Sequence, residues 1–449
     1  MSEGESGHNT GTPQGAPKEG PHSGGVSRRG LLARVGAAAL IGAGTGLGAG
    51  EVLAPRADTA ADTAAAPRLR MSGAHAPASG PGRLQPGITG TPPAFAHVLA
   101  LDLADSPGGG GEGGGSAAES RERAAEVLRA WTAAADRLRE EGPAAVLPGA
   151  PSAGLLPASL GVTAGLGGSL LAAAGLQDAR PEAMADLPSF STDALQQEWC
   201  GGDLLLQVGA EDPVVAAAAV QHLLGRAGAR VRVRWAVRGF RRTAAAAEDP
   251  GATPRNLMGQ IDGTNNPARE SSLLQRTVQV GRAAGPAWMA GGSYVVVRRI
   301  RMLLDDWFGE DSGHRERVIG RDLPTGAPLG QQGAGAEVDL TARDAEGRPR
   351  IPEHAHIRLA SPQNNLGARM LRRGYSFDEG WRGDGTRDAG LLFMAWQADP
   401  ARGFVAVQQN LAEAGDALNE YTRHEGSALF AVPPAARNGG YIGQDLLES

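Results

Sequence analysis

The chain has 449 residues, of which 41% are hydrophobic and 20% are charged, and its formal net charge is −6. This length and composition predict a globular protein with two domains once the tails are set aside. The acidic balance argues against a nucleic-acid-binding protein, because such a protein needs a strongly basic face. Cys200 is the only cysteine, which excludes an internal disulfide, a cysteine-rich metal site and covalent haem attachment through paired cysteines.

The N-terminal segment carries an export pattern. Residues 1–26 are rich in Gly, Ser and Pro and too poor in large apolar side chains to fold. Arg28 and Arg29 precede an uncharged, weakly apolar stretch over 35–50, which is shorter than the ~20 residues of a bilayer span. This arrangement resembles a twin-arginine signal, the route of proteins exported already folded; the alternative is a chance arginine pair before an Ala-rich segment. We expect residues 1–66 to form a disordered n-region and a signal peptide, and the protein to be extracellular, at the cell surface or periplasmic.

The elements of the first ordered block follow a linker over 67–84 that is rich in Ala, Pro and Ser. The segment 120–140 reads as an amphipathic helix, because one stripe of it would carry the apolar residues Ala124, Val127, Leu128, Trp131 and Leu138. The pattern predicts a strand over 95–104, a glycine-rich loop over 108–115, that helix over 120–140, a strand over 202–212, a helix over 214–228 and a strand over 230–240. The order β-α-β-α-β is compatible with a ferredoxin-like domain over residues 85–245.

A second block over residues 246–449 repeats this order loosely. The stretches SYVVVRRIRM (293–302) and GLLFMAWQ (390–397) are strand-like, and helical stretches lie between them. The predicted fold class is therefore α+β, with two ferredoxin-like domains of antiparallel sheet.

The stretch GQIDGTNNP, residues 259–267, has the composition of a tight turn. On one interpretation Asp262 is a solvated turn residue whose side chain bonds its own backbone. On the other, a carboxylate flanked by glycines lies where a ligand approaches the backbone closely, because glycine lets other atoms come near. The stretch alone leaves both interpretations open.

Two further stretches carry polar groups among structural signals. HAHIRLASPQ (354–363) predicts a strand with His356 on one face, and ARMLRRGYSF (368–377) predicts a short helix with Arg372 in its last turn. A histidine in a half-buried strand can be a hydrogen-bonded side chain or a ligand. An arginine pair at a helix end can be an ordinary solvated terminus.

The four stretches together, GxxDG at 259–263, GGSYxVVRRIRM, HIRLA at 356–360 and RMLRRGYSF at 369–377, resemble the dye-decolourising peroxidase family of haem enzymes. The resemblance covers roughly residues 85–445 and is nearest to the exported branch that includes deferrochelatase-type iron-uptake peroxidases. It implies two ferredoxin-like domains in a dimeric α/β-barrel-like arrangement. It also implies one non-covalent haem b per chain, in a cavity of the second domain.

The resemblance assigns roles by position. His356 corresponds to the proximal iron ligand, with His354 as a rival outside the motif position. Asp262 corresponds to the distal carboxylate and Arg372 to the distal guanidinium. A proximal carboxylate that bonds the other nitrogen of the ligand histidine corresponds to Asp416.

The remaining implied haem contacts are Gly263, Thr264 and Asn265 after the aspartate, and Ser361, Pro362 and Gln363 after HIRLA. Relatives commonly have Asn-Pro-Arg at the latter position, so this chain lacks the guanidinium that would meet a haem propionate there. Glu420 is the alternative to Asp416 as the proximal carboxylate.

These residue types suit cleavage of a peroxide bond. An imidazole on one face of the iron leaves the other face open, and cleavage needs a base that moves a proton and a cation near the oxygens. We expect an exported peroxidase that reduces hydrogen peroxide and oxidises dyes, phenolics or another donor; the alternatives are an iron-handling deferrochelatase with iron-uptake partners, and an exported binding module without a cofactor. Trp396 and Tyr375 are candidate relays for electrons from bulky donors, or simply core residues.

Overall fold

The computed structural model describes residues 83–104, 116–146, 149, 151, 153–246, 249 and 252–449. These residues belong to one compact unit. The expected signal region, nearly all of the linker and the glycine run at 108–115 lie outside them, so these expectations stay predictions. Among the described residues, no helix has the length and apolar character that a bilayer span requires.

The described chain folds into nine strands and nine α-helices, with short 3₁₀ turns between them. The strands are β1 (Phe95–Leu103), β2 (Gly161–Gly167), β3 (Leu204–Ala210), β4 (Val231–Phe240), β5 (Ser293–Met302), β6 (Leu371–Arg372), β7 (Tyr375–Trp381), β8 (Arg387–Gln397) and β9 (Thr422–Val432). The helices are α1 (Ala117–Val146), α2 (Gly168–Ala173), α3 (Pro213–Ala227), α4 (Ser272–Val278), α5 (Leu304–Gly309), α6 (Ser312–Ile319), α7 (His356–Leu359), α8 (Ala406–Glu413) and α9 (Gln444–Leu447).

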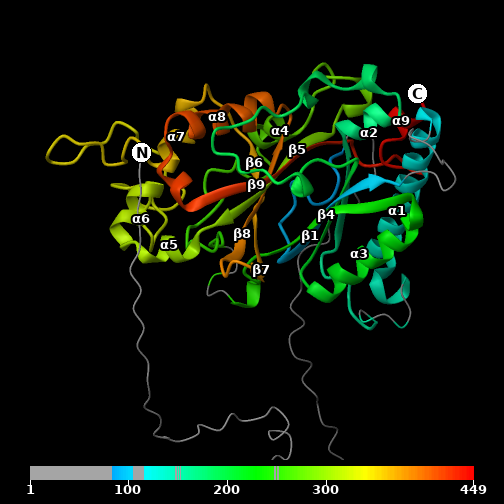
Figure 1. The fold of residues 1–449 in the computed structure, drawn as a ribbon, viewed down its shortest axis with the longest axis horizontal. Helices are drawn as coiled ribbons and strands as arrows, with labels where there is room; N and C mark the ends of the chain where they lie inside the picture. Colours follow the sequence, from blue (N-terminus) through cyan, green and yellow to red (C-terminus); the bar gives the residue numbers. More distant parts are fainter. Residues whose placement is uncertain are drawn as a thin grey trace, which may run out of the picture. The chain divides into compact units, whose positions relative to one another are not determined.

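The strands form one antiparallel sheet that closes on itself like a barrel (Figure 1). Its order is β5-β9-β2-β3-β1-β4-β7-β8-β6, and β5 also pairs with β8. The first half of the chain contains β1 to β4 and the second half contains β5 to β9. Long ladders join neighbouring strands within each half, whereas the pairings between the halves are short. Strand β2 meets β9 only at Leu166–Ala431 and Gly167–Phe430, and β4 meets β7 only at Phe240–Ser376. Each half therefore forms one arc of the ring, and the two arcs meet at two short joins.

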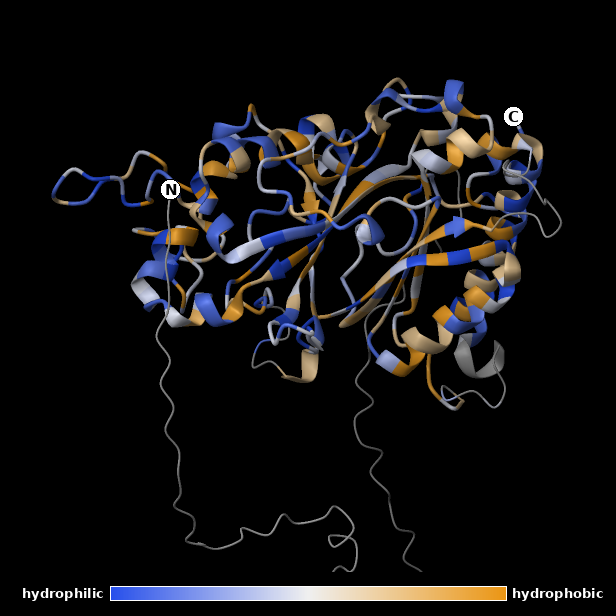
Figure 2. Ribbon diagram, viewed as in Figure 1, coloured by the Kyte–Doolittle hydropathy of each residue, from blue (hydrophilic) through white to orange (hydrophobic). Residues whose placement is uncertain are grey.

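The interior of the ring is a single apolar cluster. It includes a fully or almost fully buried side chain from each of seven strands: Val98, Leu205, Trp235, Val295, Phe377, Trp396 and Phe430. A second cluster lies between the outer face of the first half and helices α1 and α3, which are apolar toward the sheet and polar toward solvent (Figure 2). The predicted helical stripe from Ala124 to Leu138 is buried in this second cluster, which confirms the helix prediction.

Strand β5 directs alternate side chains to opposite faces, as any strand must. Val295 and Val297 face the ring interior, whereas Ile300 and Met302 face a cavity outside it. In the partner strand β9 one extra residue, Glu425, makes a β-bulge, because the register shifts where β5 passes from residue 299 to residue 300.

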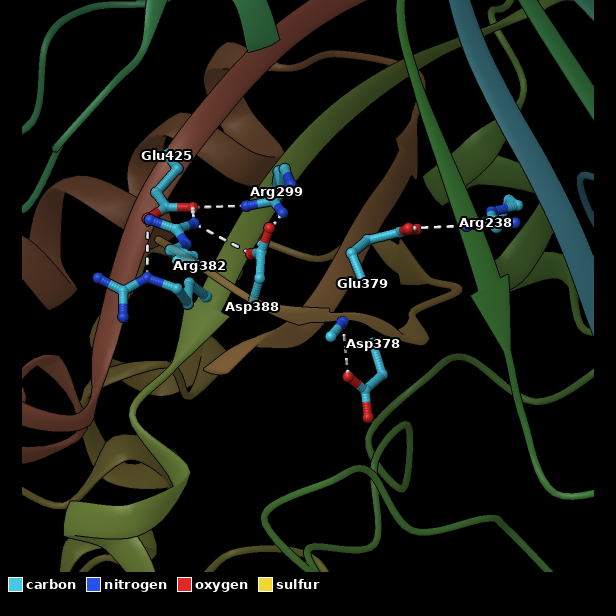
Figure 3. Close-up of polar contacts among 9 residues, drawn as sticks. Arg238, Arg299, Asp378, Glu379, Arg382, Asp388 and Glu425 are labelled. Atoms are coloured by element: carbon cyan, nitrogen blue, oxygen red, sulfur yellow. Dashed lines mark hydrogen bonds and ion pairs between the residues drawn. The ribbon is translucent and has the colours of Figure 1, made fainter. Parts of the chain in front are cut away.

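A buried ion network fills the end of the ring next to this bulge (Figure 3). Arg299 is only 3% exposed; its guanidinium donates to Glu425 and, at 2.6 Å, to Asp388. It is also stacked over the rings of Trp199 and Phe377, at 4.5 and 4.4 Å. Because every charge in the network has a partner of opposite sign, it ties β5, β8 and β9 together without leaving an unpaired ion.

Most predicted strands and helices are confirmed, and two predictions near the motifs are wrong. Residues 356–359 form a short helix, α7, instead of a strand. Residues 371–381 form β6 and β7 instead of a helix end, because Arg372 pairs with Ala395 of β8. The sequence analysis also missed β2, whose GVTAGLG sequence has too many glycines to signal a strand.

Candidate functional site

A large cavity lies outside the ring, between the outer faces of β5, β8 and β9 and the segments that carry the sequence motifs. Its empty volume is about 1590 Å³, including the part open to solvent. Much of the lining is apolar, with Ile300, Met302, Leu391, Phe393 and Phe404 among its residues. Polar and charged side chains also belong to the lining, so the cavity combines apolar walls with groups that can orient a cofactor.

One imidazole enters the cavity from α7. Nδ1 of His356 donates to Oδ2 of Asp416 at 2.7 Å, and Asp416 is only 4% exposed. A carboxylate only accepts hydrogen bonds, so this contact places the proton on Nδ1 and leaves the lone pair of Nε2 free. The structure therefore favours Asp416 over Glu420, which is exposed, as the partner of His356.

His354 does not line the cavity. Its side chain is exposed, and its Nδ1 lies 3.0 Å from the carbonyl oxygen of Ala414. The structure thus brings His356, and not His354, to the cavity.

A carboxylate and a guanidinium enter the same cavity from two other segments. Oδ1 of Asp262 lies 3.6 Å from Nη1 of Arg372, and the two side chains are 27% and 28% exposed. Gly259 and Gly263 flank the aspartate with φ values of 81° and 98°, so the turn needs glycine at both positions. Asp262 lines the cavity beside Arg372, so the structure favours the second interpretation of its stretch, in which the carboxylate lies where a ligand approaches.

The side chain of Asn266 fixes the position of the arginine backbone. Its Nδ2 donates to the carbonyl oxygen of Arg372 at 2.8 Å, and its Oδ1 accepts from the Arg372 amide at 2.9 Å. Strand β8 pairs with one edge of β6. The side-chain amide of Asn266 bonds the other edge, in the place that a neighbouring strand would take. The sequence analysis missed Asn266, because its partner is 106 residues away in the chain.

A second histidine, His424 at the bulge of β9, also lines the cavity and was missed. Its Nδ1 lies 3.2 Å from Nη2 of Arg298, which in turn bonds Asp193. Burial, followed by the charges of Arg298 and His356, lowers the pKa of His424 to about 3. This imidazole is therefore neutral at ordinary pH.

The cavity also holds a buried arginine. Arg321 is 6% exposed and donates through Nη1 to the carbonyl oxygens of Gly326 and Ala334, at 2.7 and 3.0 Å. Burial lowers its pKa to about 10, so it stays charged at neutral pH. The sequence analysis found no arginine directly after the HIRLA motif. Arg321 supplies a cation to the cavity instead.

The predicted haem contacts divide into two groups. Thr264, Asn265 and Pro362 line the cavity. Gly263 instead borders a neighbouring pocket, Ser361 is buried with no hydrogen bond to its hydroxyl, and the side-chain amide of Gln363 lies 3.4 Å from the Val338 carbonyl. Contact of these three with haem stays a prediction.

The two candidate relay residues lie in the ring interior. Trp396 is fully buried and Tyr375 is 1% exposed. Neither the indole Nε1 nor the phenol oxygen makes a hydrogen bond within the described part of the chain.

The donor set suits a haem. A porphyrin needs apolar walls, one neutral nitrogen ligand and cations for its two carboxylates, and the cavity offers each of these through its apolar lining, His356 and Arg321. No group of three or more His, Cys, Asp and Glu side chains that could hold a bare metal ion occurs in the described residues.

Comparison with known proteins identifies the family of the chain. Family models match two parts of the chain: "Dyp-type peroxidase, N-terminal" over residues 116–241 and "Dyp-type peroxidase, C-terminal" over residues 253–437. The chain belongs to the DyP-type peroxidase family. It is a haem enzyme, since haem b is the cofactor of that family.

The relatives of the chain include a dye-decolorizing peroxidase and a deferrochelatase, the two enzymes that the sequence analysis considered. A dye-decolorizing peroxidase of Thermobifida fusca is 62% identical over 94% of this chain and 98% of that protein. A deferrochelatase of Yersinia pseudotuberculosis is 38% identical over 66% of this chain and 68% of its own length. The first relative is much nearer, so the DyP-type peroxidase activity is established and the deferrochelatase is a more distant relative.

Solved structures of DyP-type peroxidases share the antiparallel, barrel-like arrangement of this chain. Ferric DtpA from Streptomyces lividans has a TM-score of 0.74 and 46% identity, and the match covers 81% of this chain and 95% of that chain. A variant of DypB from Rhodococcus jostii, solved in complex with heme, has a TM-score of 0.56 at 20% identity, with 82% of this chain and 98% of that chain covered.

Proposed function

We propose that the chain is an exported peroxidase in which His356 holds the haem iron, and Asp262 and Arg372 act together on hydrogen peroxide. The observation that carries this proposal is the presence of two side-chain pairs in one cavity: His356 with Asp416, and Asp262 with Arg372. A small organic molecule serves as the electron donor.

The imidazole pair positions the cofactor. Asp416 accepts the Nδ1 proton and so orients the ring of His356 and makes Nε2 a better ligand. Arg321 would supply the cation for a haem carboxylate, in place of the arginine that relatives carry after HIRLA. When bound, the haem supplies the iron and porphyrin from which two electrons pass to hydrogen peroxide.

The other pair handles protons and charge. Asp262 takes a proton from one peroxide oxygen and delivers it to the other, so that the departing oxygen leaves as water. Arg372 stabilises the negative charge that develops on the oxygens as their bond breaks. The two side chains lie 3.6 Å apart and line the same cavity, so one peroxide molecule could contact both.

The proposed architecture has two ferredoxin-like halves. Such a domain has the order βαββαβ and a sheet in which the fourth strand lies beside the first. The first half has the sheet order β2-β3-β1-β4, and the second has β9-β5-β8 followed by β6 and β7. Both orders support the proposal.

Export by the twin-arginine route is part of the same proposal, supported by Arg28 and Arg29 before the weakly apolar stretch. An extracellular, cell-surface or periplasmic location follows from it. Iron-uptake partners have no such support in the described residues, and the Asp262–Arg372 pair favours peroxide chemistry over simple haem handling.

Stopped-flow mixing of the ferric holoprotein with peroxide tests the catalytic roles. Asp262→Asn should slow the absorbance change of the haem by about 10²- to 10⁴-fold, the usual contribution of a positioned acid–base group. Arg372→Leu should slow it by ~10²- to 10³-fold, as loss of an electrostatic donor does. Asp186→Asn, at a side chain that is 93% exposed, is the control. Parent rates in both cavity variants, with haem bound, would refute the mechanism.

A further inference from the structure

A segment of the first half of the chain, residues 187–199, lies against the wall of the haem cavity. Its backbone contacts β9, where the amide of Ala194 donates to the carbonyl oxygen of His424 at 3.0 Å. Its Phe190 packs edge-on against Phe404, a residue of the cavity wall, with 5.9 Å between the ring centres. The first half therefore supports a cavity whose lining residues all belong to the second half.

Asp193 in this segment pairs with a buried arginine of β5. Arg298 is 1% exposed, and within the described residues Asp193 is the only carboxylate that forms an ion pair with it. Arg298 lies on the same face of β5 as the cavity residue Ile300, two positions away. Its guanidinium contacts the rings of Phe190 and Phe404, at 5.6 and 5.8 Å from their centres. A buried cation and its counter-ion thus lie next to the cavity wall.

Arg298 also determines where His424 carries its proton. Nη2 of Arg298 lies 3.2 Å from Nδ1 of His424. A guanidinium has donors only, so Nδ1 accepts this hydrogen bond and the proton of the neutral imidazole is on Nε2. Burial and the charge of Arg298 both lower the pKa of His424, which disfavours a second proton on the ring. Asp193, Arg298 and His424 therefore form a chain of contacts that ends at the cavity.

The Nε2–H of His424 has no partner in the described part of the protein. The ring lines the cavity and is 7% exposed. No described residue accepts a hydrogen bond from Nε2, and this nitrogen keeps surface that protein atoms do not cover. A buried N–H without an acceptor costs free energy. An oxygen of the bound haem, or of a water held beside it, would complete the hydrogen bond.

We infer that Asp193 is a positioning residue for the haem. Through Arg298 it fixes His424 in the tautomer that directs an N–H at the cavity, and it balances the charge of a buried cation beside the cofactor. The inference concerns the haem cavity and is independent of the roles proposed for Asp262 and Arg372, because neither residue belongs to this chain of contacts.

Nitrogen NMR of the holoprotein tests the tautomer. In the diamagnetic, carbon monoxide-bound ferrous protein with isotope-labelled histidine, the signals of His424 are assigned by their loss in His424→Gln. They should show the proton on Nε2. The double variant Asp193→Asn with Arg298→Met removes the donor to Nδ1 without leaving an unpaired charge, and should give a mixture of tautomers. A proton on Nδ1 in the parent, or an unchanged pattern in the double variant, would overturn the inference.

The midpoint potential of the haem tests the charge balance. Asp193→Asn keeps the shape of the side chain and leaves Arg298 without a counter-ion, so the potential should become more positive, because a nearby cation favours the ferrous state. Asp388→Asn is the matched control, since it takes a carboxylate from Arg299, on the opposite face of β5 (Figure 3). The control should shift the potential clearly less, and equal shifts would refute a local effect. If Asp193→Asn fails to fold, the double variant decides, with a potential near that of the parent and a tautomer that is no longer fixed.

Haem retention tests the N–H itself. His424→Leu removes the donor and should release haem to apomyoglobin about two- to tenfold faster, the effect of one neutral hydrogen bond. The amide of His424→Gln can accept from Arg298 through its oxygen and donate into the cavity through its nitrogen, so this variant should retain haem like the parent. Equally fast release from both variants would show that the ring only fills space. If Asp262→Asn and Arg372→Leu react with peroxide at parent rates while these results hold, the positioning role stands and the proposed mechanism falls.

Discussion

Replacing Asn266 by Ala should slow the reaction with peroxide while leaving haem bound. The side-chain amide makes two hydrogen bonds, of 2.8 and 2.9 Å, to the backbone of Arg372, and within the described residues it has no hydrogen bond to His356 or Asp416. Each bond contributes ~0.5–1.5 kcal/mol, so the free energy of unfolding should fall by ~1–3 kcal/mol. Arg372 then remains present but is less well held. Since loss of this guanidinium costs ~10²- to 10³-fold, its displacement should cost less, about tenfold.

Gln85→Ala is the matched control for this experiment. The amide of Gln85 forms the same kind of clamp on Ala164, donating to its carbonyl oxygen at 2.9 Å and accepting from its amide at 2.8 Å, and it makes one bond more, from Nε2 to the carbonyl oxygen of Pro433 at 2.9 Å. This clamp lies in the first half of the chain, outside the haem cavity. Both variants should unfold at lower temperature, and only Asn266→Ala should react more slowly in stopped flow. If the two variants react equally fast, the clamp stabilises the fold without positioning Arg372.

Three further predictions concern the histidines and the signal. His356→Ala should lose most of its haem, or the absorption spectrum of its ferric state, while His354→Ala keeps both; the reverse result would reassign the ligand. The pKa of His424 is lowered from 6.5 to about 3 in the folded chain. Between these pH values the unfolded chain binds a proton at His424 and the folded chain does not, so stability is lost as the pH falls from about 6.5 towards 3. His424→Gln should flatten that loss, which can reach ~1.4 kcal/mol per pH unit, in denaturant titrations at several pH values. Changing Arg28 and Arg29 to Lys should keep the haem-loaded protein in the cytoplasm, and normal export would refute the twin-arginine assignment.

The sequence predicted the residues of the site better than their local structure. Asp262, His356 and Arg372 all reach one cavity, as the motif resemblance implies. Yet His356 lies on a helical turn and Arg372 on a strand, opposite to the predicted elements. Short segments of four or two residues have too little periodicity to separate helix from strand, and pairing with β8 makes the two-residue segment at Arg372 a strand.

The missed residues act through partners that are distant in sequence. Arg321 donates to carbonyl oxygens of its own loop, and nothing in its neighbourhood marks it as a cavity residue. His424 turns toward the cavity beside the bulged Glu425, and a bulge has no clear signal in one sequence. Such roles arise from the packing of strands and could not be inferred from composition or spacing.

The joining of the two halves at both ends of their sheets has a consequence for each half made alone. Each half supplies both outer neighbours of the other, so a half made alone would leave the edges of β2 and β4 without partners and prone to pair with other chains. The ring closes only when β9, the last strand of the described sheet, inserts between β2 and β5. That strand also brings Thr422 and His424 to the haem cavity. Strand β9 thus both closes the sheet and completes the cavity, so the cavity requires the whole ring, which suits a protein that we propose leaves the cytoplasm already folded.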